Sequence, residues 1–166
     1  MGYKTLCKYA LNYGVKLSEE ESNTLVVRYK EAYPRLTAWQ VETTTIASEL
    51  LSTQTVCGMK RKLSDDNYYT CSLNTPVQGS AAEVILVALT VLDEYIQKNK
   101  LSAKIVATVH DEILVECSKE DSQVVKKALE TIMHKAFIFV FDKVGIRGAD
   151  ANIVEAHIGG NWYEAK

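Results

Sequence analysis

Three ionisable side chains follow one another at His110, Asp111 and Glu112. They lie between two β-rich runs, residues 104–109 and 112–117, which leave only two residues for a turn. We therefore predict a β-hairpin with His110 and Asp111 at its tip. Two-residue turns favour Asn-Gly or Asp-Gly, and a departure from such a rule is typical of functional sites. A carboxylate fixed there suits a divalent cation, although aspartate is also a common turn residue without any further role.

Two amide side chains, Asn74 and Gln78, stand four residues apart around a predicted helix start. Thr75 offers an N-cap, the following proline suits the first helical position, and Gln78 completes a capping box. We therefore expect a mostly buried helix from Thr75 to about Lys98. Amides on one face of it could read hydrogen-bond acceptors in the minor groove of DNA, but helix capping explains the same residues.

A cluster of basic residues, Lys60, Arg61 and Lys62, lies in a segment that we expect to be extended and broken at Gly58. Such a cluster could clamp the phosphates of a nucleic acid. Charge clusters next to turns are also commonly solvated without a ligand. The residues alone leave both interpretations open.

The remaining elements must position these three groups. Ser18 and Glu21 form a capping-box pattern at the start of a helix that should end before Pro34. The order of the elements indicates an α+β domain, with an antiparallel sheet covered by helices. The expected elements are helices at residues 2–13, 18–33, 35–51, 75–98 and 120–141, strands at 104–109 and 112–117, and a last strand at about 151–158.

The composition fits one globular domain or a large piece of one, with 166 residues, 47% hydrophobic and 24% charged. The net charge of −2 argues against a free-standing DNA-binding module, but not against a fragment whose basic surface lies elsewhere.

Four cysteines without a CxxC pair indicate neither a zinc ribbon nor a redox motif, and we expect reduced cysteines in a cytoplasmic protein. No signal peptide is expected. The longest apolar stretch, residues 84–92, is too short to span a bilayer, so we expect no membrane partner.

Several motifs together resemble one family. Residues 74–83 (NTPVQGSAAE) resemble the N-x-P-[IV]-Q-G-[ST]-A-A-[DE] helix of family A DNA polymerases, the bacterial DNA polymerase I type. Residues 109–116 (VHDEILVE) are similar to that family's motif C. The resemblance covers nearly the whole chain and implies the C-terminal part of a polymerase domain. Shorter matching stretches lie at residues 28–34, 58–61 and 160–165.

The resemblance implies a fold and a metal site. Residues 1–52 would be fingers-side helices, and residues 53–166 would be the palm, an antiparallel sheet carrying the motif C hairpin. Asp111 would be the motif C metal ligand. Glu112 would support the metal site, and His110 would lie near the primer terminus. The implied reaction is template-directed nucleotidyl transfer to a primer 3′-hydroxyl by two Mg²⁺ ions.

The resemblance also implies contacts with the template–primer duplex. Asn74 and Gln78 would contact its minor-groove side, and Lys60 and Arg61 would approach its backbone. One departure lies four residues before the asparagine, where the family usually has an arginine and this chain has Thr70. A minor-groove contact would be lost there.

Two parts of the family pattern are absent from the 166 residues, namely the motif A aspartate and the helix that binds the dNTP. Since one aspartate cannot hold two metal ions, we expect this chain to be inactive alone. Its expected partners are DNA template–primer, dNTP and a second chain that carries the missing parts. A split gene, an artificially shortened chain and a decayed remnant all fit, and the position of Met1 at a motif boundary favours the split gene.

Two other functions fit the same residues. The first is a non-catalytic remnant that binds DNA or a partner protein, although a binding module has no use for the Asp111–Glu112 pair. The second is an unrelated metal hydrolase built on His110 and Asp111, for which the sequence offers no further ligands at sensible spacing. A palm without its neighbouring strand should also expose apolar surface and a sheet edge. Self-association of the chain could cover that surface.

Overall fold

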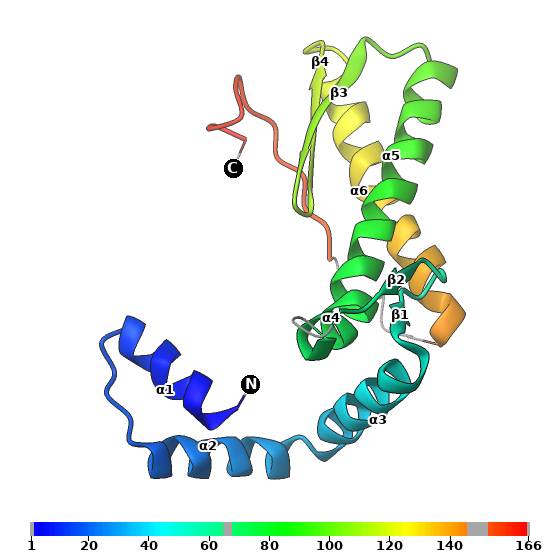
Figure 1. Ribbon diagram of the computed structural model, residues 1–166. Helices are drawn as coiled ribbons and strands as arrows, with labels where there is room; N and C mark the ends of the chain where they lie inside the picture. Colours follow the sequence, from blue (N-terminus) through cyan, green and yellow to red (C-terminus); the bar gives the residue numbers. More distant parts are fainter. Residues whose placement is uncertain (1, 65–67, 146–152, 166) are drawn as a thin grey trace. The chain divides into compact units, whose positions relative to one another are not determined.

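A computed structural model of the chain describes residues 2–64, 68–145 and 153–165 (Figure 1). The chain is α+β, mostly helical with two small antiparallel sheets. It divides into two compact units, Met1–Leu50 and Leu51–Lys166. The assignment of these parts to fingers and palm stays a prediction.

The first unit consists of α1 (Tyr3–Asn12), α2 (Glu19–Ala32) and α3 (Pro34–Leu50), close to the predicted ranges. The predicted capping box at the start of α2 is confirmed. The backbone N–H of Ser18 donates to Glu21 Oε2 at 2.8 Å, and the N–H of Glu21 donates to Ser18 Oγ at 3.1 Å. The bond from the Ser18 backbone, and then that from its side chain, lower the pKa of the Glu21 carboxyl.

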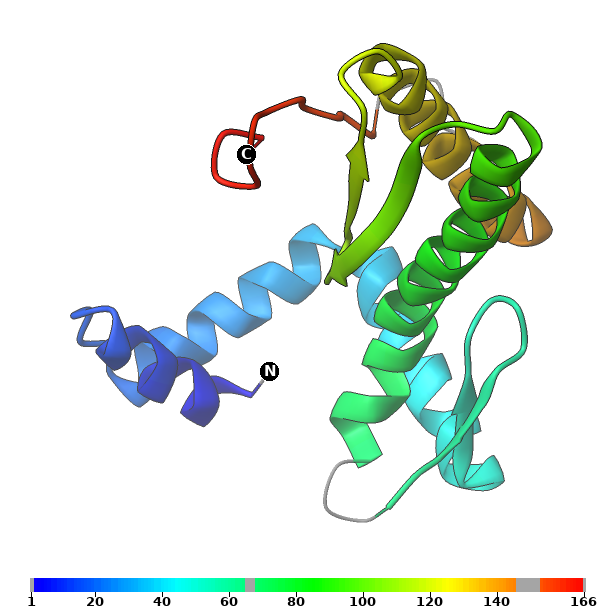
Figure 2. The same ribbon diagram turned by 90° about the horizontal axis from the view of Figure 1, so that it is seen from above.

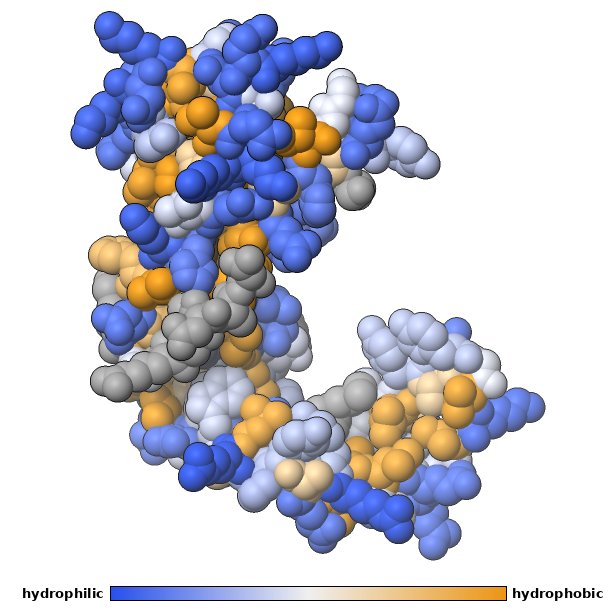
Figure 3. All heavy atoms as spheres, turned by 180° about the vertical axis from the view of Figure 1, so that it is seen from behind, coloured by the Kyte–Doolittle hydropathy of each residue, from blue (hydrophilic) through white to orange (hydrophobic). Residues whose placement is uncertain are grey.

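Apolar side chains reach the surface of this first unit (Figure 3). Within its described residues only Ser22 and Ala47 are buried. Unit 1 therefore has little core of its own. Its exposed apolar side chains include Leu11, Val15, Leu25 and Val27.

The second unit carries all seven residues for which the sequence predicted a role. Two short hairpins flank one long helical segment, and a further helix packs against that segment. The elements are β1 (Ser52–Gln54), β2 (Lys60–Lys62), α4 (Tyr68–Asn74), a π-helical turn (Thr75–Gly79), α5 (Ser80–Lys98), β3 (Ala103–Val109), β4 (Glu112–Cys117), α6 (Ser122–Phe141) and a 3-10 turn (Asp142–Val144).

The core of the second unit lies between α5 and α6, with the β3–β4 hairpin lying alongside them (Figures 1 and 2). Leu92 of α5 and Val140 of α6 have no exposed surface. Ile113 supplies the contribution of β4 to the same cluster. Burial of these apolar side chains is the main source of stability for this unit.

The predicted helix start at Thr75 is wrong. The helix begins at α4, and Asn74 already has helical backbone angles and makes no side-chain cap. Pro76 lies inside a π-helical turn, so Thr75 and Gln78 form no capping box. Proline lacks a backbone N–H and clashes with the carbonyl four residues earlier, and a π turn relieves that conflict without ending the helix.

Within the described residues, the continuous helical segment Tyr68–Lys98 is the one helix that is long and apolar enough to cross a membrane, by length and composition only. The sequence-based expectation considered only the densest apolar stretch and missed this length. The buried stripe formed by Ala88, Leu92 and Ile96 packs in the core with α6. Such packing is typical of a core helix.

The two hairpins form separate two-stranded sheets, rather than one larger sheet. The predicted pairing of β3 with β4 is confirmed, with Val109 opposite Glu112. The predicted last strand is wrong for residues 153–158, which lie in no strand, and residues 151–152 lie outside the described residues. The N–H of Ala156 donates to Glu130 Oε1 at 3.1 Å instead of to a neighbouring strand.

Candidate functional site

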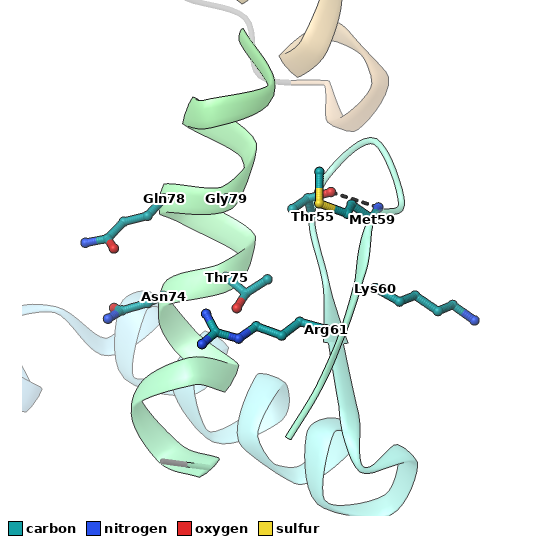
Figure 4. A pocket seen from close by; sticks show the side chains of 8 residues that line it. All are labelled: Thr55, Met59, Lys60, Arg61, Asn74, Thr75, Gln78 and Gly79. Carbon is teal, nitrogen blue, oxygen red and sulfur yellow. Dashed lines mark hydrogen bonds between the residues drawn. The ribbon is translucent and has the colours of Figure 1, made fainter. Parts of the chain in front are cut away.

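A hollow of about 310 Å³ lies between the β1–β2 hairpin and the π-helical turn (Figure 4). It brings together four residues that the sequence predicted as DNA contacts in two separate groups. The basic pair comes from β2, and the amide pair comes from the helical segment. The hollow is lined by Thr55, Met59, Lys60, Arg61, Asn74, Thr75, Gln78 and Gly79.

The side chains around this hollow do not all point the same way. Figure 4 shows that Arg61 extends from β2 toward the helical segment, whereas Lys60 points away from it. Successive residues of a strand face opposite sides, so the two cations cannot share one ligand face. Asn74 and Gln78 project to the same side of the helical segment and are exposed, as the four-residue spacing predicts. Arg61 is therefore the cation that accompanies the amides.

A buried carboxylate holds the β1–β2 hairpin against α5. Glu83 is only 6% exposed, and its Oε1 accepts a hydrogen bond of 2.5 Å from Thr55 Oγ1. Its Oε2 accepts one of 3.2 Å from the N–H of Cys57. One turn earlier on the helix, Ser80 Oγ accepts from the N–H of Val56 at 2.9 Å. Three consecutive residues of the hairpin turn are thus bonded to two side chains of α5.

The helix and the hairpin turn approach each other too closely for a side chain at Gly79. A Cβ atom there would lie 2.8 Å from Cγ2 of Thr55. Nearby, the hydroxyl of Thr75 is buried and has no hydrogen-bond partner within the described residues. Glycine at position 79 therefore permits this close packing, and its backbone angle is an ordinary one.

Sequence reasoning missed Thr55, Ser80 and Glu83 as contributors to this site. Glu83 carried the clearest signal, because a carboxylate stands there at the edge of the apolar run of the buried helix. Buried carboxylates need hydrogen-bond donors, which here come from a segment 28 and 26 residues away in sequence. No local pattern identifies such distant donors.

The second predicted site lies at the tip of the β3–β4 hairpin, where Asp111 and Glu112 are exposed. Neither carboxylate makes a hydrogen bond or ion pair within the described part of the chain. His110 has φ of 55°, a left-handed backbone angle that costs energy in any residue except glycine. In an ordinary turn, the aspartate carboxylate accepts hydrogen bonds from the turn itself. Here the turn has a strained backbone angle and its carboxylates are unpaired within the described residues.

The carboxylates of Asp111 and Glu112 supply the oxygen donors that Mg²⁺ prefers, but only part of a metal site. The residues that the structure describes contain no group of three or more His, Cys, Asp or Glu side chains that could hold a metal ion. The donor set on these residues therefore does not by itself fit the pair of ions that the resemblance implies.

The two predicted sites line separate hollows. Asp111 and Glu112 border a wider hollow of about 1100 Å³ between β4, α6 and residues 153–165. The hairpin runs back along α5, and its tip is directed toward the end of the segment where α4 lies (Figures 1 and 2). The prediction that Asp111, Asn74 and Gln78 share one concave face stays a prediction.

Known proteins match this chain along most of its length. Residues 5–164 match the family model described as DNA polymerase family A. DNA polymerase I of Aquifex aeolicus (strain VF5) is 33% identical over 163 residues, which cover 96% of this chain and 27% of that protein. DNA polymerase I of Caldicellulosiruptor bescii is 29% identical over 95% of this chain and 19% of its own length.

Solved structures give the same match. The POL domain of Pol1 from M. smegmatis, in complex with DNA primer-template and dNTP, matches 77% of this chain with a TM-score of 0.69 and 28% identity. The match covers 24% of that chain. The present chain thus spans about a quarter or less of the length of these relatives.

Proposed function

Because this chain belongs to DNA polymerase family A, we propose that it supplies two parts of a DNA-directed DNA polymerase. One part grips the template–primer duplex, and the other provides a carboxylate for the catalytic metal site. The observation that carries the proposal is the grouping of Arg61, Asn74 and Gln78 around one hollow, although they come from two separate segments. The M. smegmatis relative is described with DNA primer-template and dNTP bound, which supports these ligand classes.

The exposed groups at the hollow match the chemistry of a duplex. A guanidinium binds phosphate oxygens through paired N–H donors, which fits Arg61 to the DNA backbone. The amides of Asn74 and Gln78 can donate to the acceptors that every base pair presents in the minor groove. Such contacts hold the duplex without reading its sequence, as a polymerase must. Lys60 points away from the helix, so it contributes only to the overall positive electrostatic potential near the duplex.

The β3–β4 hairpin provides the second part. Asp111 is the metal ligand, Glu112 is the neighbouring carboxylate, and His110 lies beside the primer terminus. Bound Mg²⁺ would stabilise the charge on the attacking and leaving oxygens. The proposed role of this chain is to hold Asp111 exposed and unpaired at the tip of a hairpin that packs on the core. The remaining carboxylate and the dNTP-binding helix must come from other residues, in a second chain or segment.

Binding to DNA is tested by fluorescence anisotropy of a labelled primer–template, titrated with the 166-residue chain at several salt concentrations. For a chain with a net charge of −2 we expect weak binding, with a Kd on the order of 10⁻⁴ to 10⁻⁶ M. Arg61→Ala should weaken binding on the order of tenfold and reduce the salt slope by about 1. Lys98→Ala, at the far end of α5, is the matched control and should change neither. Equal losses in both variants would contradict the assignment of Arg61.

Catalysis is tested by extension of a labelled primer with Mg²⁺ and dNTPs. The chain alone should give no product, because its donor set is incomplete. Addition of a polypeptide that carries the missing carboxylate and the dNTP-binding helix should restore extension, and Asp111→Ala should abolish it. If DNA binds but no complement restores extension, the chain is instead a DNA-binding remnant. Extension by the chain alone that Asp111→Ala does not reduce would overturn the role of Asp111.

A further inference from the structure

Glu83 is buried in the first turn of α5, and no described cation forms an ion pair with it. Placing a carboxylate in a buried position costs free energy unless hydrogen bonds replace its water. Here the two oxygens accept from Thr55 Oγ1 and the N–H of Cys57. A helix that needed only a core would gain more from an apolar residue at this position. Core packing therefore does not explain why a carboxylate occupies this position.

The contacts of Glu83 fix the turn of the β1–β2 hairpin. Thr55 Oγ1, which donates to Glu83, also accepts from the N–H of Met59 at 3.0 Å. The carboxylate thus orients a hydroxyl that in turn closes the hairpin turn across Gly58. Two residues beyond Met59, β2 presents Arg61 to the hollow. The position of Arg61 depends on this turn.

We propose that Glu83 is a positioning residue for DNA binding, because its bonds to Thr55 and Cys57 hold Arg61 beside the amides of the helix. The inference rests on the proposed function, since it assigns Arg61 to the DNA backbone. Glu83 itself touches no DNA. It acts by joining the strand that carries the cation to the helix that carries Asn74 and Gln78, so that both contact one duplex in a fixed relation.

The test is Glu83→Gln, which keeps the shape of the side chain. Its amide oxygen can still accept from Thr55, but its NH₂ group then faces the N–H of Cys57, so two donors meet. Loss of a negative charge by itself should strengthen DNA binding. If Glu83 positions Arg61, the affinity for DNA should instead fall about three- to tenfold. The salt slope should also be lower by about 1. Glu94→Gln, an exposed glutamate on the same helix, is the matched control for charge and should bind DNA as well as the unchanged chain or better.

Double variants separate positioning from general damage. In an Arg61→Ala background, Glu83→Gln should weaken binding less than about twofold, because the group it positions is gone. In an Asn74→Ala background it should keep its full effect, because Asn74 lies on the helix. A purely structural role would instead give the same loss in both backgrounds. That result, or a gain in affinity in Glu83→Gln itself, would overturn the inference while leaving the proposed function intact.

A second variant covers the case in which Glu83→Gln does not fold. Thr55→Val keeps the branched shape but removes the hydroxyl, and it should weaken DNA binding as Glu83→Gln does. Thr55→Ser restores the hydroxyl and should restore binding. Native-state hydrogen exchange at the amides of Cys57 and Met59 should accelerate in Thr55→Val only. Equal binding by the valine and serine variants would overturn the inference, and no DNA binding by the unchanged chain would overturn the proposed function and the inference together.

Discussion

The two hairpins of the second unit carry opposite charges and are held in opposite ways. The β1–β2 hairpin is basic, only three residues long on each strand, and docked on α5 through hydrogen bonds to Ser80 and Glu83. The β3–β4 hairpin is longer, rests on the apolar core through Ile113, and ends in an exposed acidic tip. One hairpin is fixed at its turn, and the other is fixed along its strands.

The difference shows how each hairpin presents its functional groups. A short hairpin buries too little apolar surface to be stable alone, so polar bonds at its turn must orient the cation on its strand. A hairpin that packs along its strands needs no contact at its turn, which leaves Asp111 free for a ligand. In the first case hydrogen bonds anchor the turn to α5, and the strand presents the functional group. In the second case the working part is the turn.

The largest expected effect tests how the acidic hairpin is held. Ile113→Ala should lower the free energy of unfolding by about 2–5 kcal/mol, because it removes a buried side chain from the α5–α6 core. Chemical denaturation followed by circular dichroism measures this. The control is Val106→Ala on β3, which is 55% exposed and should change stability by no more than about 0.5 kcal/mol. Similar losses in both variants would show that the strands are not fixed by this core.

A smaller effect tests how the basic hairpin is held. Gly79→Ala should cost about 1–3 kcal/mol, because its Cβ meets Cγ2 of Thr55 at 2.8 Å. Adding Thr55→Ser, which lacks that methyl group, should recover part of the loss. Gly2→Ala, with no atom near its Cβ, is the control and should be nearly neutral. A loss in Gly79→Ala that the serine substitution leaves unchanged would place the strain elsewhere.

The smallest effect on stability should come from Asp111→Asn. Because the Asp111 carboxylate is exposed and unpaired within the described residues, its removal should change the free energy of unfolding by less than about 0.5 kcal/mol. Thermal unfolding measures the change, and Glu94→Gln, which alters another exposed carboxylate of the same unit, is the control. A loss of more than about 1 kcal/mol would mean that the carboxylate stabilises its own turn, and the contrast between the two hairpins would fail.

The sequence predicted the elements whose signals are local. The capping box at Ser18 and the two-residue turn of the β3–β4 hairpin follow from a few neighbouring residues, and the structure confirms both. The helix start at Thr75 was wrong for a physical reason, since the same residues that suit a helix start can also occupy a π turn. The docking role of Glu83 could not be predicted, because its donors Thr55 and Cys57 come from a distant segment.

The π-helical turn at Thr75–Gly79 holds one residue more than an α turn. Each residue of an α-helix advances about 100° around the axis, so an extra residue in a regular helix would rotate α4 by that amount relative to α5. The wider turn takes up the extra residue locally, so the two helices keep nearly the same rotational relation. A deletion between Asn74 and Gln78 would leave these amides three residues apart, a spacing that still places them on one face of a regular helix. At this point of the chain, a single-residue deletion should therefore shorten the helix without separating the amides.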